Sequence, residues 1–297
     1  MKNTTAVVTL YNPKQTAADN MKSLAAQVTT LILSDNSPSG NNAALFSGIK
    51  NAVYIRNGKN LGLSGGINRG LQTDEVKNSD YVFFFDQDSE VPEGHIDTMI
   101  EDWERLERDH RIGLLGAHFL DEISGNEDAD NIIKDEAENK DERYLPVEQM
   151  ITSSMLTKYP LIADINFWNE EIFLDFADYD LCWRFLAAGY ELFITKSVCL
   201  RHSLGDGKVE AHILFSKDKK FTMGYSAPFR KYYQTRALMK LRKTDYVPEN
   251  WKKWLKANLT VRTFYDLRFL PDKRKRFCFY LRGLIDGARG KSGELKL

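Results

Sequence analysis

The sequence predicts an α/β protein in which helices flank a mostly parallel sheet, followed by a basic helical region. Short apolar runs alternate with helix-like stretches through the first part of the chain, as in a series of βαβ units. Residues 81–85 are five apolar side chains in a row, which suits a strand covered on both faces. Residues 230–297 hold 19 Lys or Arg against 6 Asp or Glu, which marks them as a separate structural unit.

The expected elements follow one another as in a doubly wound sheet with right-handed crossovers. Strands are expected at residues 6–10, 31–33, 53–55, 81–85 and 112–119, and helices at 13–26, 41–48 and 64–71. A further helix opens near Pro92, because proline is favoured in a first helical turn. Its apolar stripe has the spacing of a core-facing helix and consists of Ile96, Met99, Ile100, Trp103 and Leu106.

An acidic segment interrupts the second half of the chain. Residues 121–142 hold ten acids and two Lys, which is too much charge to bury, so we expect a solvated loop over the sheet. After it, a helix is expected at 177–190, and strands at 191–195 and 198–201. Beyond Pro228 the pattern becomes helical and basic. We therefore divide the chain into a domain at 1–225 and a basic helical region at 226–297.

Length and composition limit the class of protein. The 297 residues are 42% hydrophobic, which is typical of a folded globular chain. No apolar run approaches the roughly 18 residues of a membrane span, and the first apolar run ends at Tyr11, too early for a signal peptide. Three widely spaced cysteines, Cys182, Cys199 and Cys278, favour neither a disulfide framework nor a cysteine-built zinc site. A cytoplasmic protein is expected.

The charge of the tail needs an explanation, because the rest of the chain is acidic, with 22 Lys or Arg against 36 Asp or Glu. Two explanations stay open: peripheral contact with an anionic membrane surface, or docking of the tail on the acidic body. No nucleic-acid partner is expected, because the tail lacks an RNA-binding signature. Aromatic side chains are interleaved with the basic ones and are expected at the surface: Tyr232, Tyr233, Trp251, Trp254, Phe264, Tyr265, Phe277, Phe279 and Tyr280.

Two carboxylates follow the buried strand at 81–85. Asp86 and Asp88 stand one residue apart at its carboxyl end, the edge where parallel α/β sheets bind ligands. A hard ion such as Mg²⁺ or Mn²⁺ prefers carboxylate oxygens and often bridges them to substrate phosphates. The pair therefore indicates a phosphorylated or nucleotide substrate. The alternative for Asp-x-Asp at this position is a helix N-cap or a turn.

Polar and glycine residues follow the other strands of the series. Asp35 can accept a hydrogen bond from a pyrimidine N3–H, and Thr9, Tyr11 and Asn12 offer a ring face and polar edges to a base. A turn built on Asp35 is the alternative. Three glycines at the start of a helix allow close backbone approach to a ligand and favour phosphate there: Gly62, Gly65 and Gly66.

Six motifs occur in one order along the chain, at residues 8–13, 33–38, 60–70, 85–89, 178–184 and 201–205. In this order they resemble the family 2 glycosyltransferases of GT-A fold, and most closely the bacterial rhamnosyltransferases. The resemblance covers about residues 5–240. It implies a GT-A fold, which is Rossmann-like with a mostly parallel sheet flanked by helices, and a nucleotide-sugar donor.

The resemblance also implies the site residues. The donor is expected across the strand-end loops, with the donor-binding residues Thr9, Tyr11, Asn12, Asp35, Asn36, Asn60, Gly62, Gly65, Asn68, Asp86 and Gln87. Asp88 is expected to ligate Mg²⁺ or Mn²⁺, Asp86 to hold the donor, directly or through that metal, and His202 to join the metal cluster. Asp178 matches the family's catalytic aspartate, and Asp180 is the second candidate, because Ala177 stands where an acid is frequent. Two N-capping aspartates are the alternative.

Together these features predict an inverting, metal-dependent glycosyltransferase. We expect it to transfer L-rhamnose from dTDP-L-rhamnose to a surface polysaccharide or a lipid-linked glycan precursor of a bacterial cell wall, capsule or O-antigen. A UDP-linked hexose or galactofuranose is the alternative donor. Two rivals of other classes are a non-catalytic nucleotide-sugar or glycan-binding protein and a phosphohydrolase of the haloacid dehalogenase type. Whether the chain is a monomer or a homodimer is left open.

Overall fold

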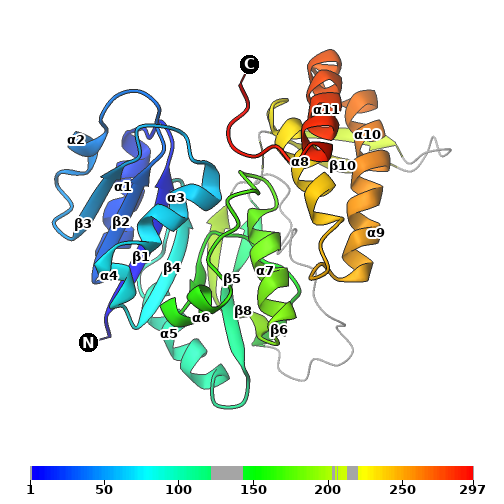
Figure 1. Cartoon of the computed structure of the whole chain (residues 1–297). Coiled ribbons are helices and arrows are strands. Elements are labelled where there is room, and N and C mark those ends of the chain that lie inside the picture. The colour runs from blue at the N-terminus through cyan, green and yellow to red at the C-terminus, as the bar shows by residue number, and fades with distance from the viewer. Residues whose placement is uncertain (1, 122–142, 203–204, 206, 213–219, 297) are drawn as a thin grey trace.

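A computed structural model of the chain describes residues 2–121, 143–202, 205, 207–212 and 220–296 (Figure 1). The acidic segment that we expected to be a solvated loop lies outside the described residues, apart from Asp121. Eight strands form one sheet, in the order β3-β2-β1-β4-β7-β5-β8-β6. They are β1 (Thr4–Leu10), β2 (Thr30–Asp35), β3 (Ala52–Arg56), β4 (Tyr81–Asp86), β5 (Ile112–Asp121), β6 (Tyr144–Pro146), β7 (Met155–Thr157) and β8 (Glu191–His202).

The sheet is parallel where the sequence predicts it. Strands β3, β2, β1 and β4 pair in parallel, and β5 pairs in parallel with β8. Two short strands run the other way: β7 lies antiparallel between β4 and β5, and β6 lies antiparallel along β8. The predicted mostly parallel sheet is confirmed. The two antiparallel strands, β6 and β7, are only three residues long, and their short apolar runs do not indicate the direction of a strand.

Helices cover both faces of the sheet (Figure 1). In the N-terminal part they are α1 (Gln15–Ala25), α2 (Ala43–Phe46), α3 (Gly62–Leu71), α4 (Asp74–Lys77) and α5 (His95–Leu106). In the middle are α6 (Tyr159–Asp164) and α7 (Ala177–Ala187), and then α8 (Arg230–Leu241), α9 (Glu249–Ala257), η1 (Asn258–Arg262), α10 (Thr263–Phe269) and α11 (Lys273–Ala288). A hairpin of β9 (Gly207–His212) and β10 (Lys220–Tyr225), absent from our prediction, stands apart from the sheet.

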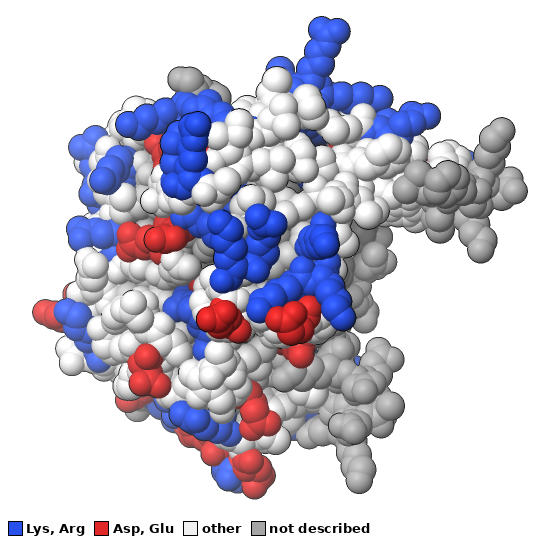
Figure 2. Space-filling view, turned by 45° about the vertical axis from the view of Figure 1, so that its right-hand side comes forward, with Lys and Arg blue, Asp and Glu red and all other residues white. Residues whose placement is uncertain are grey.

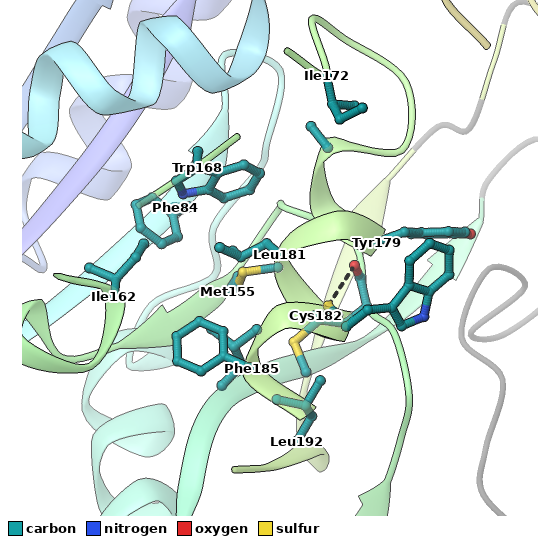
Figure 3. Close-up of a cluster of buried hydrophobic side chains, with 14 of the residues drawn as sticks. Phe84, Met155, Ile162, Trp168, Ile172, Tyr179, Leu181, Cys182, Phe185 and Leu192 are labelled. Atoms are coloured by element: carbon teal, nitrogen blue, oxygen red, sulfur yellow. Dashed lines mark hydrogen bonds between the residues drawn. The ribbon is translucent and has the colours of Figure 1, made fainter. Parts of the chain in front are cut away.

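The two faces of the sheet belong to two separate hydrophobic clusters. Val7 and Phe84 point into one cluster, whereas Val8, Phe83 and Phe85 point into the other. Alternation on a pleated strand thus sends the continuous apolar run at 81–85 to both faces. Figure 3 shows the first cluster, in which the ring of Phe84 lies against Trp168 at a centroid distance of 5.4 Å.

Two predicted strands at 191–195 and 198–201 are one strand in the structure. Strand β8 runs through both, with an irregularity in its pairing to β5: Ala117 pairs with Thr195, but His118 pairs with Cys199. The extra residues form a bulge, which breaks the apolar pattern and makes one strand look like two.

The C-terminal helices are partly built into the main core. Tyr232, Tyr233 and Trp251 are 2%, 6% and 2% exposed, so the expectation that these aromatics lie at the surface is wrong for them. Helix α11 packs on α8 through Gly283 and Gly287, where an added Cβ would meet α8 within 2.8 Å. Because residues of α8 and α9 share the cluster of Figure 3, they contribute to one core with the sheet. The domain boundary at 225/226 stays a prediction.

Candidate active site

The carboxyl ends of three neighbouring strands bring the first candidate residues together. Leu10 of β1 pairs with Asp35 of β2, and Thr9 pairs with Asp86 of β4. The hydroxyl of Thr9 is buried and has no hydrogen-bond partner among the described residues. Thr9, Asp35 and Asp86 therefore end at one edge of the sheet, as the βαβ series predicts for a ligand site.

Two candidate residues are cross-linked just beyond this edge. The backbone N–H of Tyr11 donates to Oε1 of Gln87 at 2.9 Å, and Nε2 of Gln87 donates back to the Tyr11 carbonyl at 3.3 Å. The Tyr11 side chain is 46% exposed, so its ring is open to a ligand. Asn12 has a φ of 45°, in the left-handed region that asparagine tolerates, and its N–H donates to the Ser37 hydroxyl at 2.7 Å.

The Asp35 carboxylate is buried and firmly held. One oxygen accepts the backbone N–H of Ser37 and the other accepts Nδ2 of Asn42, both at 2.8 Å, and the Tyr54 hydroxyl also donates to the second oxygen. Burial raises the pKa of Asp35, but these hydrogen bonds outweigh it and leave the pKa below its usual value. Burial and the bond to Asp35 raise the pKa of Tyr54 to about 12. Asp35 is thus a fixed anion beside the strand ends, 1% exposed and already bonded to the protein.

Helix α3 packs tightly behind the strand ends. A Cβ on Gly66 would lie 2.7 Å from Thr9 and 2.8 Å from the Asn36 side chain, which donates to the Gly62 carbonyl at 2.7 Å. Gly62 itself has a φ of 75°, and a Cβ there would lie 2.1 Å from the Phe173 carbonyl. The backbone of Phe173 therefore makes the close approach at Gly62. This contact alone explains the glycine, without the ligand that we expected there.

The remaining candidates of α3 contact other parts of the chain. Nδ2 of Asn68 donates to the Trp168 carbonyl and to Glu170, both at 2.9 Å, and Oδ1 accepts the Trp168 N–H. Asn60 accepts the Gly62 N–H and donates to Glu294 near the C-terminus, both at 3.0 Å. A Cβ on Gly65 would lie 2.9 Å from the side chain of Leu61, the residue just before α3. These residues connect α3 to the loop before α7 and to the C-terminal segment.

The turn after β4 lies beside the end of β8. Asp86 is half-buried and Asp88 is exposed, and Glu90 forms an antiparallel bridge with Arg201. The backbone of His202, which follows Arg201, is thereby brought next to the turn that carries Asp88. Two carboxylates and an adjacent imidazole-bearing segment suit a hard divalent ion. Among the residues whose side chains are described, no group of three or more His, Cys, Asp or Glu is arranged as a metal site, and the His202 side chain is not among them.

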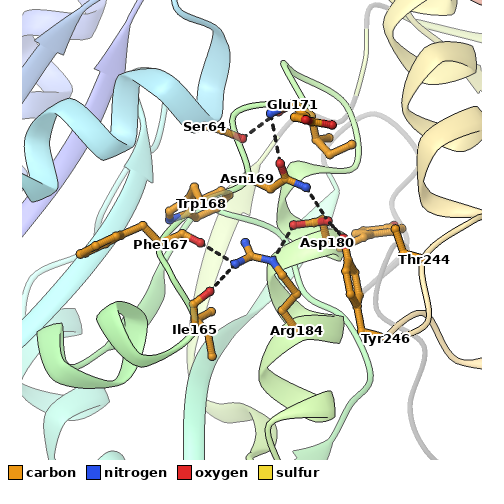
Figure 4. Close-up of polar contacts among 12 residues, drawn as sticks. Ser64, Ile165, Phe167, Trp168, Asn169, Glu171, Asp180, Arg184, Thr244 and Tyr246 are labelled. Carbon is orange, nitrogen blue, oxygen red and sulfur yellow. Dashed lines mark hydrogen bonds and ion pairs between the residues drawn. The ribbon is translucent and has the colours of Figure 1, made fainter. Parts of the chain in front are cut away.

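Asp178 and Asp180 differ sharply in their surroundings, although both lie in the first turn of α7. Figure 4 shows the surroundings of Asp180. Asp178 is half-buried, and its Oδ1 accepts the backbone N–H of Tyr179 at 2.9 Å. Asp180 is 0% exposed, and its carboxylate accepts bonds from Arg184 at 2.8 Å, Asn169 at 3.2 Å and Tyr246 at 2.5 Å. Asp178 is thus partly exposed, whereas the Asp180 carboxylate is buried and bonded to three side chains.

Arg184 connects Asp180 to the loop before α7. Its Nη1 donates to the carbonyls of Ile165 and Phe167, at 2.7 and 2.6 Å (Figure 4). That loop packs on α3, because the Ser64 hydroxyl donates to the Ile172 carbonyl at 2.8 Å. The network thus connects α7, through the loop before it, to α3, which packs on Thr9.

A second connection joins α7 to the Asp86–Ser89 turn. The Ser89 hydroxyl is hydrogen-bonded to the Ser153 hydroxyl. In the same segment, the Met150 carbonyl accepts the Cys182 thiol of α7 at 3.9 Å. The turn with Asp88 and the helix with Asp178 are therefore packed against one buried segment, residues 150–154.

Sequence reasoning missed several residues of this region. Tyr54 and Asn42 hold Asp35, and Asp175, three residues before Asp178, is bonded to Arg230 of α8 at 2.8 Å. An acid next to an expected helix start was a signal for Asp175. No sequence signal links Tyr54 or Asn42 to Asp35, because the contacts depend on β3 pairing with β2 and on the fold of the intervening loop.

Comparison with known proteins identifies the family. The profile of glycosyl transferase family 2 matches residues 5–158, more than half of the chain. The chain belongs to glycosyl transferase family 2. It is an enzyme, a glycosyltransferase, and its resemblance to the rhamnosyltransferases is confirmed by a curated relative. The rivals of a phosphohydrolase and of a non-catalytic binding protein are thereby excluded.

That relative is the dTDP-rhamnosyl transferase RfbF of Shigella flexneri, which is 24% identical over 256 residues, 82% of this chain and 81% of its own length. Solved structures share the fold. GalNAc-T7, crystallised with UDP, GalNAc and Mn²⁺, has a TM-score of 0.57 at 11% identity over 86% of this chain. S. aureus TarS has a TM-score of 0.51 at 13% identity over 97%. The chain covers 54% and 49% of these two, so it spans about half of their length.

Proposed function

We propose that this glycosyltransferase is an inverting, metal-dependent rhamnosyltransferase that uses dTDP-L-rhamnose as its donor. The acceptor would be a surface polysaccharide or a lipid-linked glycan precursor. One observation supports the proposal: Asp35 and Asp86 end the strands on either side of β1 at one sheet edge, and the turn with Asp88 and the helix with Asp178 both contact the buried segment 150–154. The name of the Shigella flexneri relative supports the choice of donor.

The nucleotide would bind at the ends of β1 and β2. The exposed ring of Tyr11 offers a face for the base, and the hydroxyl of Thr9 is buried without a partner. Asp35 is ionised but 1% exposed and bonded to Ser37, Asn42 and Tyr54, so the N3–H of thymine or uracil would reach it only by displacing one of these partners. Both pyrimidines present this N–H, so a UDP-sugar remains the alternative donor.

The diphosphate would lie near the turn after β4. Asp88 and Asp86, with His202 from the end of β8, would hold a Mg²⁺ or Mn²⁺ ion. The carboxylate oxygens suit either ion. When bound, such an ion would neutralise the charge that develops on the leaving diphosphate.

Asp178 would act as the base that takes the proton from the acceptor hydroxyl. Inversion requires a base on the face of the sugar opposite the leaving group. Asp178 is half-buried on the first turn of a helix, whereas the Asp180 carboxylate is fully buried and engaged by Arg184 and Tyr246. Asp180 would position α7, and thereby Asp178, without contacting the substrate.

A calorimetric panel of nucleotides tests the donor. The full chain is titrated with dTDP, UDP, ADP and dTDP-L-rhamnose, with and without Mn²⁺. We expect Mn²⁺-dependent binding of both pyrimidine nucleotides, with dTDP binding at least as tightly as UDP, and negligible binding of ADP. A clear preference for UDP would replace rhamnose by a UDP-linked sugar. Equal binding with and without Mn²⁺ would contradict the metal assignment.

A further inference from the structure

An outward-facing stripe on α11 combines large apolar side chains with cations. Phe277, Leu281 and Ile285 follow one another at helical spacing and are 46%, 42% and 50% exposed. The opposite side of the helix, with Gly283 and Gly287, is buried against α8. The three apolar residues are therefore on the side of the helix that the described chain leaves uncovered.

The neighbouring elements η1 and α10 also expose large apolar side chains. Val261 of η1 is 51% exposed and Phe264 of α10 is 50% exposed, and α10 packs beside α11. These five are most of the large hydrophobic residues that are exposed in the described parts of the chain. Such a concentration of exposed apolar surface is typical of a contact site.

Positive charge surrounds the stripe. Lys273–Ala288 holds five Lys or Arg and one acid, Asp286, which is buried and bonded to Lys291 at 2.8 Å. Arg274, Arg282 and Arg289 are exposed, and Arg282 lies 3.8 Å from Asp286. Figure 2 shows Lys and Arg gathered over the upper part of this face, where the C-terminal helices lie.

Acids close to the helix do not cancel this charge. Asp266 of α10 is 4% exposed and bonded to Lys231 and Arg262, and Asp272 is paired with Lys275 at 3.5 Å. Arg276 is buried and Arg282 lies 3.8 Å from Asp286, so the exposed cations of this helix without an acidic partner in the described chain are Lys273 and Arg274, with Arg289 just beyond it. Within the described chain no helix is long and apolar enough to cross a bilayer, so contact would be with the surface.

We propose that the outward face of α11, with Val261 and Phe264 beside it, docks on an anionic lipid bilayer. Apolar side chains at the acyl boundary with Lys and Arg at the headgroups are the pattern of interfacial helices. Anionic headgroups match the charge of this face, and neutral protein surfaces do not. Both explanations of the tail then hold for different helices: α8 and α9 dock on the body, and α11 faces the membrane.

Co-sedimentation with vesicles tests the proposal on the full chain, without any sugar donor, so that its outcome is independent of the proposed activity. Vesicles of phosphatidylglycerol and phosphatidylcholine should pellet the protein at low salt, and pure phosphatidylcholine should not. High salt should release it, because the screening length shortens. The triple variant Phe277→Ser, Leu281→Ser and Ile285→Ser should lose binding at least about tenfold, since each side chain contributes buried apolar area.

Charge variants supply a matched control. Arg274→Glu with Arg289→Glu should reduce vesicle binding at least about tenfold, because each cation near the surface contributes to the attraction. Lys50→Glu with Arg108→Glu makes the same change in net charge at exposed positions of the N-terminal half and should leave binding nearly unchanged. Equal losses of vesicle binding in the two double variants would mean that net charge alone determines binding, and would overturn the proposal that the α11 face is the docking surface.

The alternative to a membrane at this face of α11 is a second copy of the chain. Light scattering on the same proteins at several concentrations decides this. A dimer that the triple serine variant converts to a monomer, together with no binding to anionic vesicles, would overturn the proposal in favour of self-association. A wild-type monomer that binds anionic vesicles supports it.

Discussion

The Tyr246 hydroxyl donates a hydrogen bond to Oδ1 of Asp180 at 2.5 Å, across 66 positions in the sequence (Figure 4). Tyr246 lies between α8 and α9, and Asp180 lies in the first turn of the helix with Asp178. The C-terminal region thus contacts the helix that carries the proposed base. Burial and the Asp180 charge raise the pKa of Tyr246, so its hydroxyl keeps its proton and remains a donor.

Tyr246→Phe should lower the free energy of unfolding by about 1.5 to 3 kcal/mol, the range for a hydrogen bond to a charged group. Urea denaturation at pH 7 measures it. Tyr159→Phe is the control, because its hydroxyl has no hydrogen-bond partner in the described part of the chain. A loss no larger than that of the control would mean that water replaces the Tyr246 hydroxyl at Asp180.

The two aspartates of α7 should give opposite phenotypes. Asp178→Asn should keep the fold and donor binding while transfer falls by about 10² to 10⁴, as for loss of a general base. Asp180→Asn should lower the free energy of unfolding by about 3 to 5 kcal/mol, because Arg184 loses the charge of its buried partner. Denaturation and a transfer assay on both variants measure this. A stable, inactive Asp180→Asn with an active Asp178→Asn would reverse the roles.

Metal-dependent binding should depend on the turn after β4. Asp88→Ala and His202→Ala should each abolish the Mn²⁺-dependent part of dTDP binding, measured by calorimetry, and leave the thermal midpoint unchanged. Glu90→Ala removes another exposed carboxylate two residues from Asp88 and should bind dTDP with Mn²⁺ as the wild type does. Retained Mn²⁺ dependence in both Asp88→Ala and His202→Ala would remove these residues from the metal site.

Sequence patterns predicted the fold well where local chemistry determined it. The run at 81–85 and the alternating helices specify a parallel sheet, because hydrophobic periodicity reports burial directly. The β8 bulge, the antiparallel β7 and the burial of Tyr232 and Trp251 depend on long-range packing, which local pattern does not encode.

The candidate site divides in the same way. Strand-end residues such as Thr9 and Asp86 were predictable, because parallel strands end at one edge. The different surroundings of Asp178 and Asp180 were not, because they depend on Tyr246, more than 60 positions away, and on Asn169 in a loop. Sequence spacing placed both aspartates on one helix turn, and only the tertiary structure separates them.

The glycine at the start of α3 should be irreplaceable for two separable reasons. Gly62 has a φ of 75°, and a Cβ would overlap the Phe173 carbonyl at 2.1 Å, whereas Gly58 has a φ of 70° with nothing within 4 Å. Gly58→Ala should therefore lower the free energy of unfolding by only about 1 kcal/mol, the cost of placing alanine in the left-handed conformation. Gly62→Ala adds a clash with backbone and should cost more than about 3 kcal/mol. Equal losses in urea denaturation would show that the loop at Phe173 yields.

The last prediction concerns pH. His95 is 1% exposed, and burial lowers its pKa to about 4, while its Nε2 is hydrogen-bonded to the Ser154 hydroxyl at 2.6 Å. The unfolded chain, with a histidine pKa near 6.5, binds a proton first as the pH falls. Below that pH, protonation stabilises the unfolded chain relative to the folded one. The free energy of unfolding therefore falls until the folded protein also binds the proton, near pH 4.

Between pH 7 and pH 5, His95 should thus remove about 2 kcal/mol of unfolding free energy, since one pKa unit corresponds to about 1.4 kcal/mol. His95→Gln has no titrating group, so the stability of the wild type relative to this variant should fall by that amount over the interval. Urea denaturation of both proteins at pH 7, 6 and 5 measures the difference, in which contributions from the carboxylates common to both cancel. A pH-independent difference for His95→Gln would mean that the buried imidazole is protonated in the folded state as readily as in the unfolded chain.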